Sequence, residues 1–276
     1  MGDGRPGPGG GPVTVIARDT RDGALVDDLR FPAGGIETEA YLVRPDRSAS
    51  HRAPSPRSAA GLPGILWWHW LDTEAPDGNR TEFLAEAAGW ATSHGIVSIL
   101  PQGTYPWRVQ PSGADADAAE VRAEVARFRA ALDVLNSDGG AAPDRIAVVG
   151  HDFGAMIAIL ALREDERPRG LVSIAATPRW GDWTLAFWPL ADDRIDYLRT
   201  LLPLDPIEAI GAISPRPVLL QHGERDFYIA RMDGFGLRRA GGDTVELQFY
   251  DAEHDLKVDD ARADRTRFLE KLLDLG

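Results

Sequence analysis

The 276-residue sequence contains no cysteine. Disulfide bonds, thiolate metal sites, iron–sulfur clusters and a cysteine nucleophile are therefore excluded. Acidic residues do gather around His254, but neighbours on one loop lack the spacing of metal ligands, and no second histidine is nearby. We expect neither a metal nor another cofactor.

Long apolar runs and an excess of positive charge are also missing. No stretch approaches the roughly 20 apolar residues of a membrane helix, and the first residues lack the apolar run of a signal peptide. The 43 acidic residues outnumber the 30 basic ones, which gives a formal net charge of -13. Such a charge repels nucleic acid and anionic membranes. We expect a cytoplasmic protein that binds neither, and the sequence does not indicate its oligomeric state.

Two segments contain few large apolar residues. Residues 1–12 are mostly Gly and Pro, and residues 44–64 are rich in Ser, Pro and Arg. Segments of this composition cannot bury enough apolar surface to offset the loss of chain entropy. We predict a disordered tail at 1–12 and a flexible surface loop at 44–64. Residues 13–276 are predicted to form a single domain, because no linker separates two cores.

The remaining sequence alternates short apolar runs with helical apolar stripes. Apolar runs predict strands at 14–16, 23–31, 37–43, 64–68, 96–100, 145–149, 171–175, 217–221 and 244–250. Apolar residues at helical spacing predict helices near 83–91, 121–135, 156–160 and 268–272. The early strands alternate, whereas the later ones are continuously apolar. This pattern predicts an α/β fold with a mixed sheet and helices on both faces.

The most informative motif directly follows the predicted strand 145–149. Gly150-His151-Asp152-Phe153-Gly154 lies between that strand and an apolar helix. In a Gly-x-nucleophile-x-Gly turn, the small flanking residues allow a sharp turn, so that the central side chain projects at the N-terminus of a helix. Asp152 occupies the centre and is therefore the candidate nucleophile.

In this context the sequence resembles the α/β-hydrolase fold and, within it, the dienelactone hydrolase family. The resemblance is carried by residues 27–45, 62–69, 143–154 and 204–223. It implies a mostly parallel sheet with helices on both faces and a triad in the chain order nucleophile, acid, histidine.

The resemblance also assigns the other site residues. Asp226, with Glu224 as a weaker candidate, takes the place of the acid, and His254 takes the place of the histidine. A carboxylate bound to one imidazole nitrogen fixes the tautomer and leaves the other nitrogen for catalysis. The backbone N–H groups of Phe153 and Trp70 are the expected oxyanion donors.

Two positions beside the expected site depart from the family or have a simpler interpretation. His69 stands where relatives usually have His-Gly, and here it is followed by the bulky Trp70. We interpret His69 and His151 as packing residues.

An aspartate in the elbow, where relatives usually carry Ser or Cys, changes the expected reaction. Attack of a carboxylate on an ester gives an anhydride, whereas attack on a carbon bearing a halide or an epoxide oxygen gives an alkyl ester, which water activated by His254 can hydrolyse. The Gly-His-Asp-x-Gly elbow is similar to that of haloalkane dehalogenases and epoxide hydrolases. The family resemblance instead favours an ester or lactone, with Asp152 as general base. A non-catalytic relative that binds a small ligand is the third alternative.

The segment 178–215 is short for the cap domain of those enzymes, and it is rich in aromatic residues. We predict a small aromatic lid and no large cap. Trp180, Trp183 and Trp188 from this segment, together with Trp107, are expected to form a pocket for a small hydrophobic or aromatic substrate. Packing within the lid is the alternative role for each of these tryptophans.

Overall fold

The computed structural model describes residues 12–46, 61–71, 78–104, 111–188 and 193–275. Within these ranges nine strands form one sheet in the order β1-β2-β3-β5-β4-β6-β7-β8-β9. The strands are β1 (Thr14–Arg21), β2 (Ala24–Ala33), β3 (Ile36–Pro45), β4 (Leu62–Trp68), β5 (Val97–Pro101), β6 (Ala141–His151), β7 (Pro168–Ile174), β8 (Val218–Gly223) and β9 (Val245–Tyr250). Each predicted strand is confirmed, with ends that differ by a few residues.

The sheet is antiparallel at one edge and parallel over the rest. β1, β2, β3 and β5 pair antiparallel in turn, whereas β5, β4, β6, β7, β8 and β9 are parallel neighbours. The carboxyl ends of the parallel strands therefore lie at one edge of the sheet. The loops after β6, β8 and β9 meet at this edge, and they contain the three predicted triad residues.

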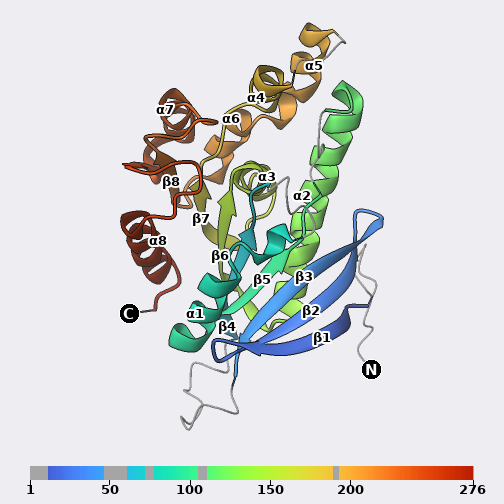
Figure 1. Cartoon of the computed structure of the whole chain (residues 1–276), viewed down its shortest axis with the longest axis vertical. Helices are drawn as coiled ribbons and strands as arrows, with labels where there is room; N and C mark the ends of the chain where they lie inside the picture. Colours follow the sequence, from blue (N-terminus) through green and yellow to red (C-terminus); the bar gives the residue numbers. More distant parts are fainter. Residues whose placement is uncertain (1–11, 47–60, 72–77, 105–110, 189–192, 276) are drawn as a thin grey trace.

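Helices cover both faces of the sheet, as predicted (Figure 1). α1 (Leu84–His94) and α8 (Asp259–Leu272) pack on one face, and α2 (Ala114–Ser137), α3 (Phe153–Leu162) and α7 (Arg231–Gly241) pack on the other. Neighbouring residues of one strand enter opposite cores, because side chains alternate along a strand. Trp67 belongs to the α1/α8 core, and Trp68 belongs to the α2/α3 core.

The segment between β7 and β8, which was predicted to be a lid, forms short helices at the top of the molecule in Figure 1. These are α4 (Trp180–Phe187), α5 (Arg194–Leu201) and α6 (Pro206–Ala209), followed by the 3-10 turn η4 (Ile210–Ile213). One buried polar contact lies within this segment, and another joins it to α2. The Trp180 N–H donates to Asp205 at 2.9 Å, and the Tyr197 hydroxyl donates to Asp117 of α2 at 2.7 Å.

The structure differs from the sequence prediction in two places. The predicted loop 44–64 is wrong at both ends, since β3 extends to Pro45 and β4 begins at Leu62. Its middle part, like residues 1–11 of the predicted tail, lies outside the described residues. Helix α7 was not predicted, because Gly234, Gly236 and Gly241 weaken its helical propensity.

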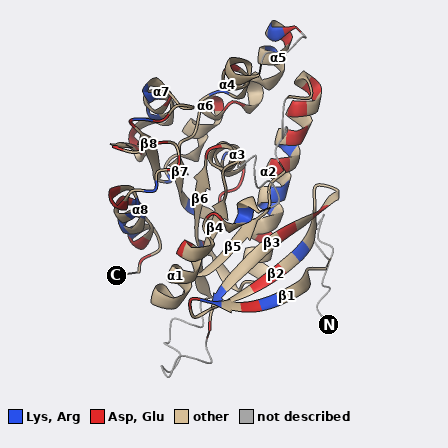
Figure 2. Ribbon diagram, viewed as in Figure 1, with Lys and Arg blue, Asp and Glu red and all other residues tan. Residues whose placement is uncertain are grey.

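Charges of both signs are interleaved on β1, β2 and β3 (Figure 2). The buried Asp27 of β2 contacts Arg18 of β1 and Arg44 of β3, and Arg30 pairs with Glu39 at 2.8 Å. Opposite charges on neighbouring strands support this strand register. In the ranges that the structure describes, no helix combines the length and apolarity needed to cross a bilayer.

Candidate active site

The Gly150-to-Gly154 motif forms a sharp turn between β6 and α3. Asp152 has φ 52° and ψ -120°, a conformation that few non-glycine residues adopt. The turn is held by the Asp152 N–H, which donates to the Ile174 carbonyl of β7 at 2.8 Å. Strained backbone of this kind persists only where the surroundings fix it. The strand, turn and helix predicted from the sequence are confirmed.

Both glycines of the motif are required by close backbone contacts. A Cβ atom on Gly150 would lie 2.7 Å from the Ala155 Cα, and one on Gly154 would lie 2.5 Å from the carbonyl oxygens of Trp68 and His69. No side chain fits at these distances. The motif therefore brings the start of α3 directly against the end of β4.

The structure brings Asp152, His254 and Asp226 together at the carboxyl edge of the sheet. His254 Nδ1 lies 2.8 Å from Asp226 Oδ2, and His254 Nε2 lies 3.8 Å from Asp152 Oδ2. The second Asp226 oxygen accepts the N–H groups of Tyr228 and Ile229 at 2.8 and 3.0 Å. The weaker candidate Glu224 instead pairs with Arg231 at the surface.

The imidazole of His254 carries a positive charge at neutral pH because it lies between two carboxylates. Burial lowers the pKa of His254, but the carboxylates of Asp152 and Asp226 outweigh this effect and raise the pKa to about 10. Burial raises the pKa of Asp226, but the bond to His254 and the two backbone N–H groups bring it below its ordinary value. The resting site is therefore an imidazolium between two acidic side chains.

The second oxygen of Asp152, Oδ1, is buried and has no hydrogen-bond partner among the described residues. An unpaired carboxylate oxygen is costly to bury, so its presence at the elbow marks a candidate functional position.

The two predicted oxyanion donors lie in different environments. Phe153 is the first residue of α3, next to Asp152, as expected. The Trp70 N–H, in contrast, donates to Glu82 Oε2 at 2.8 Å. This N–H group is therefore already bound to a carboxylate in this structure. The sequence around Trp70 does not predict the contact, because Glu82 lies 12 positions away.

The predicted packing role of His69 fits its contacts. Its Nδ1 lies 2.6 Å from the Trp70 carbonyl, and its Nε2 accepts the Gly103 N–H at 2.8 Å. Burial lowers the pKa of His69, so the ring is neutral and structural. His151 has a larger role than packing, because its two ring nitrogens contact Glu82 and the backbone of His254.

A chain of ring contacts runs from the elbow across the lid to His254. The Trp183 ring lies 4.9 Å from the Phe153 ring and 4.9 Å from Phe187. Phe187 contacts Tyr228 at 5.7 Å, and Tyr228 contacts His254 at 5.1 Å. Phe227, which is 81% exposed, joins Phe187 and Tyr228. We call Trp183, Phe187, Phe227 and Tyr228 the aromatic rim.

The predicted pocket tryptophans have different positions. Trp183 belongs to the aromatic rim, and its ring contacts Trp188 at 5.1 Å. Trp180, the first residue of α4, is buried and stacks on Phe153 at 5.5 Å, so it belongs to the hydrophobic core. Trp107 lies outside the described residues. The sequence analysis missed Phe187, Phe227 and Tyr228, although the adjacent aromatic pair after Asp226 was a usable signal.

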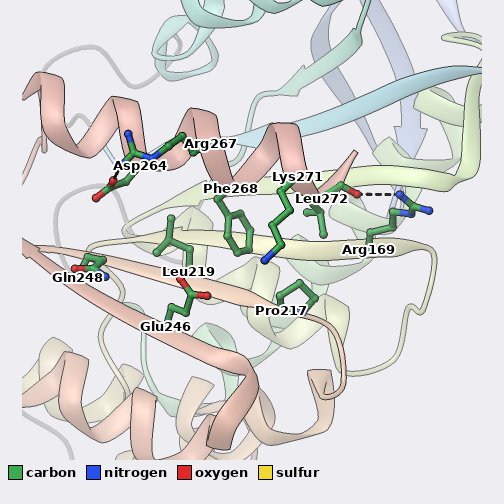
Figure 3. A pocket seen from close by; sticks show the side chains of 10 residues that line it. All are labelled: Arg169, Pro217, Leu219, Glu246, Gln248, Asp264, Arg267, Phe268, Lys271 and Leu272. Atoms are coloured by element: carbon green, nitrogen blue, oxygen red, sulfur yellow. Dashed lines mark hydrogen bonds and ion pairs between the residues drawn. The ribbon is translucent and has the colours of Figure 1, made fainter. Parts of the chain in front are cut away.

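A pocket of about 760 Å³ lies elsewhere, between α8 and the amino ends of β8 and β9 (Figure 3). Its lining includes Pro217, Leu219, Phe268 and Lys271. Because the triad lies beyond the carboxyl ends of these strands, this pocket is separate from the candidate site. Over the described residues, no group of three or more acidic or histidine side chains is arranged to hold a metal ion.

Comparisons with known proteins give a likeness in structure only. No family model matches the sequence, and no curated protein matches it. An acetyl xylan esterase from Paenibacillus sp. R4 is similar over 97% of this chain and 89% of its own, with 17% identity and a TM-score of 0.72. The fold is that of the α/β-hydrolases.

Two further α/β-hydrolase structures support this assignment. A glucuronoyl esterase from Solibacter usitatus shares 12% identity over 99% of this chain and 88% of its own, with a TM-score of 0.64. A putative dienelactone hydrolase from Klebsiella pneumoniae subsp. pneumoniae MGH 78578 shares 14% identity over 96% of this chain and 100% of its own, with a TM-score of 0.60. At identities this low, the similarity in structure shows the fold, and the activity has to be argued from the site.

Proposed function

We propose that this protein hydrolyses small esters or lactones with an apolar or aromatic group. Asp152 acts as general base, His254 as general acid, and Asp226 holds His254 in place. The observation that carries this proposal is the continuous arrangement of Asp152, His254 and Asp226 at the elbow of an α/β-hydrolase fold. The similar structures described above, two esterases and a putative dienelactone hydrolase, agree with ester chemistry.

The proton positions of the resting site suit this reaction. Asp152 takes a proton from a water molecule, and the oxygen of this water attacks the ester carbonyl. The Phe153 N–H stabilises the oxyanion that forms. The C–O bond then breaks, and His254 Nε2 gives its proton to the departing alkoxide. Transfer of the proton from Asp152 to His254 restores the starting state. One ester and one water are thereby converted into one acid and one alcohol.

The aromatic rim supports the choice of substrate class. Phe227 and Tyr228 expose 81% and 47% of their surface, and Tyr228 contacts the catalytic imidazole. Exposed aromatic side chains beside a catalytic group commonly mark a site for an apolar ligand. We propose that the rim binds the apolar part of the ester.

A second candidate reaction is favoured by the unpaired Oδ1 of Asp152 at the nucleophile position. In this reaction Asp152 attacks the carbon of a haloalkane or an epoxide and forms an alkyl ester. Release of the halide or opening of the epoxide ring completes this step. In the epoxide case His254 gives its proton to the opened ring oxygen. Water then attacks the carboxyl carbon of Asp152 and gives a proton to the neutral His254. The C–O bond of the ester breaks, the alcohol leaves, and an oxygen from water remains in the Asp152 side chain.

A single turnover in oxygen-18 water separates the two candidates. Panels of aryl esters, lactones, epoxides and haloalkanes would be tested with enzyme in excess. The enzyme would then be digested with trypsin in ordinary water. The expected tryptic peptide 146–163 contains Asp152 as its only acidic residue, so its mass reports oxygen transfer at that side chain.

We expect hydrolysis of an ester or lactone with label in the product acid and none in peptide 146–163. Label in the peptide after reaction with an epoxide or a halide would replace the general-base proposal with the alkyl-ester reaction. No turnover of any compound above the rate of His254→Gln would overturn both and favour a small-ligand-binding protein.

A further inference from the structure

Glu82 contacts two loops of the candidate site through its two carboxylate oxygens. It directly follows the 3-10 turn η2 (Asn79–Thr81), and its side chain is 14% exposed. Oε2 accepts the Trp70 N–H at 2.8 Å, and Oε1 lies 2.6 Å from His151 Nδ1. One side chain therefore links the loop after β4 to the last residue of β6.

His151 extends this link to the catalytic histidine. Its Nε2 lies 3.0 Å from the backbone carbonyl of His254. Because a carbonyl can only accept, Nε2 must carry the proton of this bond. Nδ1 faces the carboxylate of Glu82, so both ring nitrogens of His151 lie against oxygen atoms. Glu82 and His151 thus form a second carboxylate–histidine pair next to the catalytic one.

The rings around this pair are stacked. Trp70 lies 5.3 Å from His151 with an interplanar angle of 10°, and 5.7 Å from His254 with an angle of 27°. The His151 and His254 rings are 5.4 Å apart. His151 therefore holds the backbone carbonyl of His254, and Trp70 packs on the face of its ring. Glu82 binds both His151 and Trp70.

We propose that Glu82 is a positioning residue that orients His254 for catalysis through His151 and Trp70. It does not face the reacting atoms. This inference rests on the proposed function for its catalytic meaning, but its structural consequence can be measured without turnover. The orientation of a catalytic imidazole by outlying hydrogen bonds is a general requirement of such sites.

The test compares Glu82→Ala and Glu82→Gln with Glu120→Ala, which removes the same charge from an exposed position on α2. The glutamine oxygen can still accept the Trp70 N–H. Its amide group can donate to His151 Nδ1 in the tautomer that keeps the Nε2 proton. Glu82→Gln is therefore expected to preserve the arrangement that Glu82→Ala removes.

Nuclear magnetic resonance of ring-¹⁵N-labelled histidines is the first readout, with His254 assigned from His254→Gln. We expect Glu82→Ala to shift or broaden the signal of the His254 Nδ1 proton, which Asp226 accepts in the wild type. Glu82→Gln and Glu120→Ala should retain this signal. On a substrate found in the turnover panel, Glu82→Ala should lower kcat by roughly 10- to 100-fold, by analogy with the loss of a hydrogen-bond partner of a metal-bound histidine, with KM within threefold.

The inference would be overturned if Glu82→Ala kept the wild-type His254 signals and the wild-type kcat. It would also be overturned if Glu82→Gln lost both the signals and the activity. If no compound is turned over, the histidine spectra alone decide it. If Glu82→Ala does not fold, His151→Phe provides the second variant. It keeps an aromatic ring at this position but removes the two contacts that the ring nitrogens make with Glu82 and with the His254 carbonyl. That variant should change the His254 signal in the same way, and an unchanged signal would likewise contradict the inference.

Discussion

Asp152 Oδ2 lies 3.8 Å from His254 Nε2, on the side of the imidazole away from Asp226. This separation is too long for a good hydrogen bond, yet opposite charges at this distance still attract. The charge on His254 therefore depends on Asp152 as well as on Asp226. The same relationship determines which of the two residues holds a proton when a substrate arrives.

Asp152→Asn should change both the titration of His254 and the activity. Removal of one of the two flanking carboxylates should move the pKa of His254 down from about 10 toward its ordinary value. Turnover should fall roughly 10²- to 10⁴-fold, the usual range for loss of a general base. Histidine titration by nuclear magnetic resonance and initial rates would measure both effects, with the exposed Asp243→Asn as the control. An unchanged pKa of His254 would contradict the assigned geometry.

The stability of the protein should decrease at alkaline pH. The pKa of His254 is about 10 in the folded protein, against about 6.5 in an unfolded chain. The stabilisation from this raised pKa is complete below the unfolded value and is lost as the pH rises through 10. Urea unfolding at pH 7, 8.5 and 10 should show a steeper loss of the free energy of unfolding for wild type than for His254→Gln. Parallel slopes would count against this pKa.

Asp152→Ser should create a reactive serine. Without the Asp152 carboxylate, less negative charge surrounds His254, and its pKa should fall far enough for it to accept the serine proton. We expect covalent labelling by a fluorophosphonate at position 152, detected by mass spectrometry. The double variant Asp152→Ser with His254→Gln serves as the control and should react at least tenfold more slowly. Equal labelling of both variants would show that His254 does not activate this position.

Phe227→Ala should reduce selectivity for aromatic esters. Phe227 contacts Phe187 and Tyr228 in the aromatic rim, and loss of an exposed aromatic contact costs on the order of 1 kcal/mol. KM for a naphthyl ester should rise about fivefold at unchanged kcat, while KM for a small alkyl ester should stay constant. Ile195→Ala, at a 67% exposed position on α5, is the control. Equal changes for both esters would exclude a role of Phe227 in selectivity.

Gly154→Ala and Gly89→Ala should have opposite effects on stability. A Cβ on Gly154 would lie 2.5 Å from two carbonyl oxygens, so the variant should lose about 1–3 kcal/mol of unfolding free energy, together with its activity. Gly89 lies within α1, and a Cβ there meets nothing within 4 Å. Its replacement by alanine should stabilise the protein by about 0.5–1 kcal/mol. Urea unfolding measures both, and a neutral Gly154→Ala would contradict the close packing of the elbow.

The strands of the sheet were predictable because apolar runs depend on local sequence, whereas the triad was expected from the resemblance to the α/β-hydrolase fold. Apolar runs such as 145–149 and 217–221 marked the buried strands, and Asp226 and His254 follow strands whose carboxyl ends share one edge. The elbow was readable because Gly150 and Gly154 are sterically required. Composition, periodicity and strand order therefore contained most of the information on the fold.

The contacts of Glu82 were not predictable from the sequence. Its partners Trp70 and His151 lie 12 and 69 positions away, and no motif marks the short turn that presents it. The hydrogen bond of the Trp70 N–H was not predictable either, because every residue type except proline has this group and its partner depends on the fold. Trp180 looked like a pocket residue, but it is buried because the lid folds back onto Phe153.

The stacking of Trp70 on His151 and His254 also gives the protein an optical property. A protonated imidazole quenches the emission of an indole in contact with it, whereas a neutral imidazole does so far less. The fluorescence of Trp70, isolated as the difference between wild type and Trp70→Phe, is therefore expected to follow the charge of His254 in real time. The fold thus contains an intrinsic reporter of proton transfer next to its candidate catalytic base and acid.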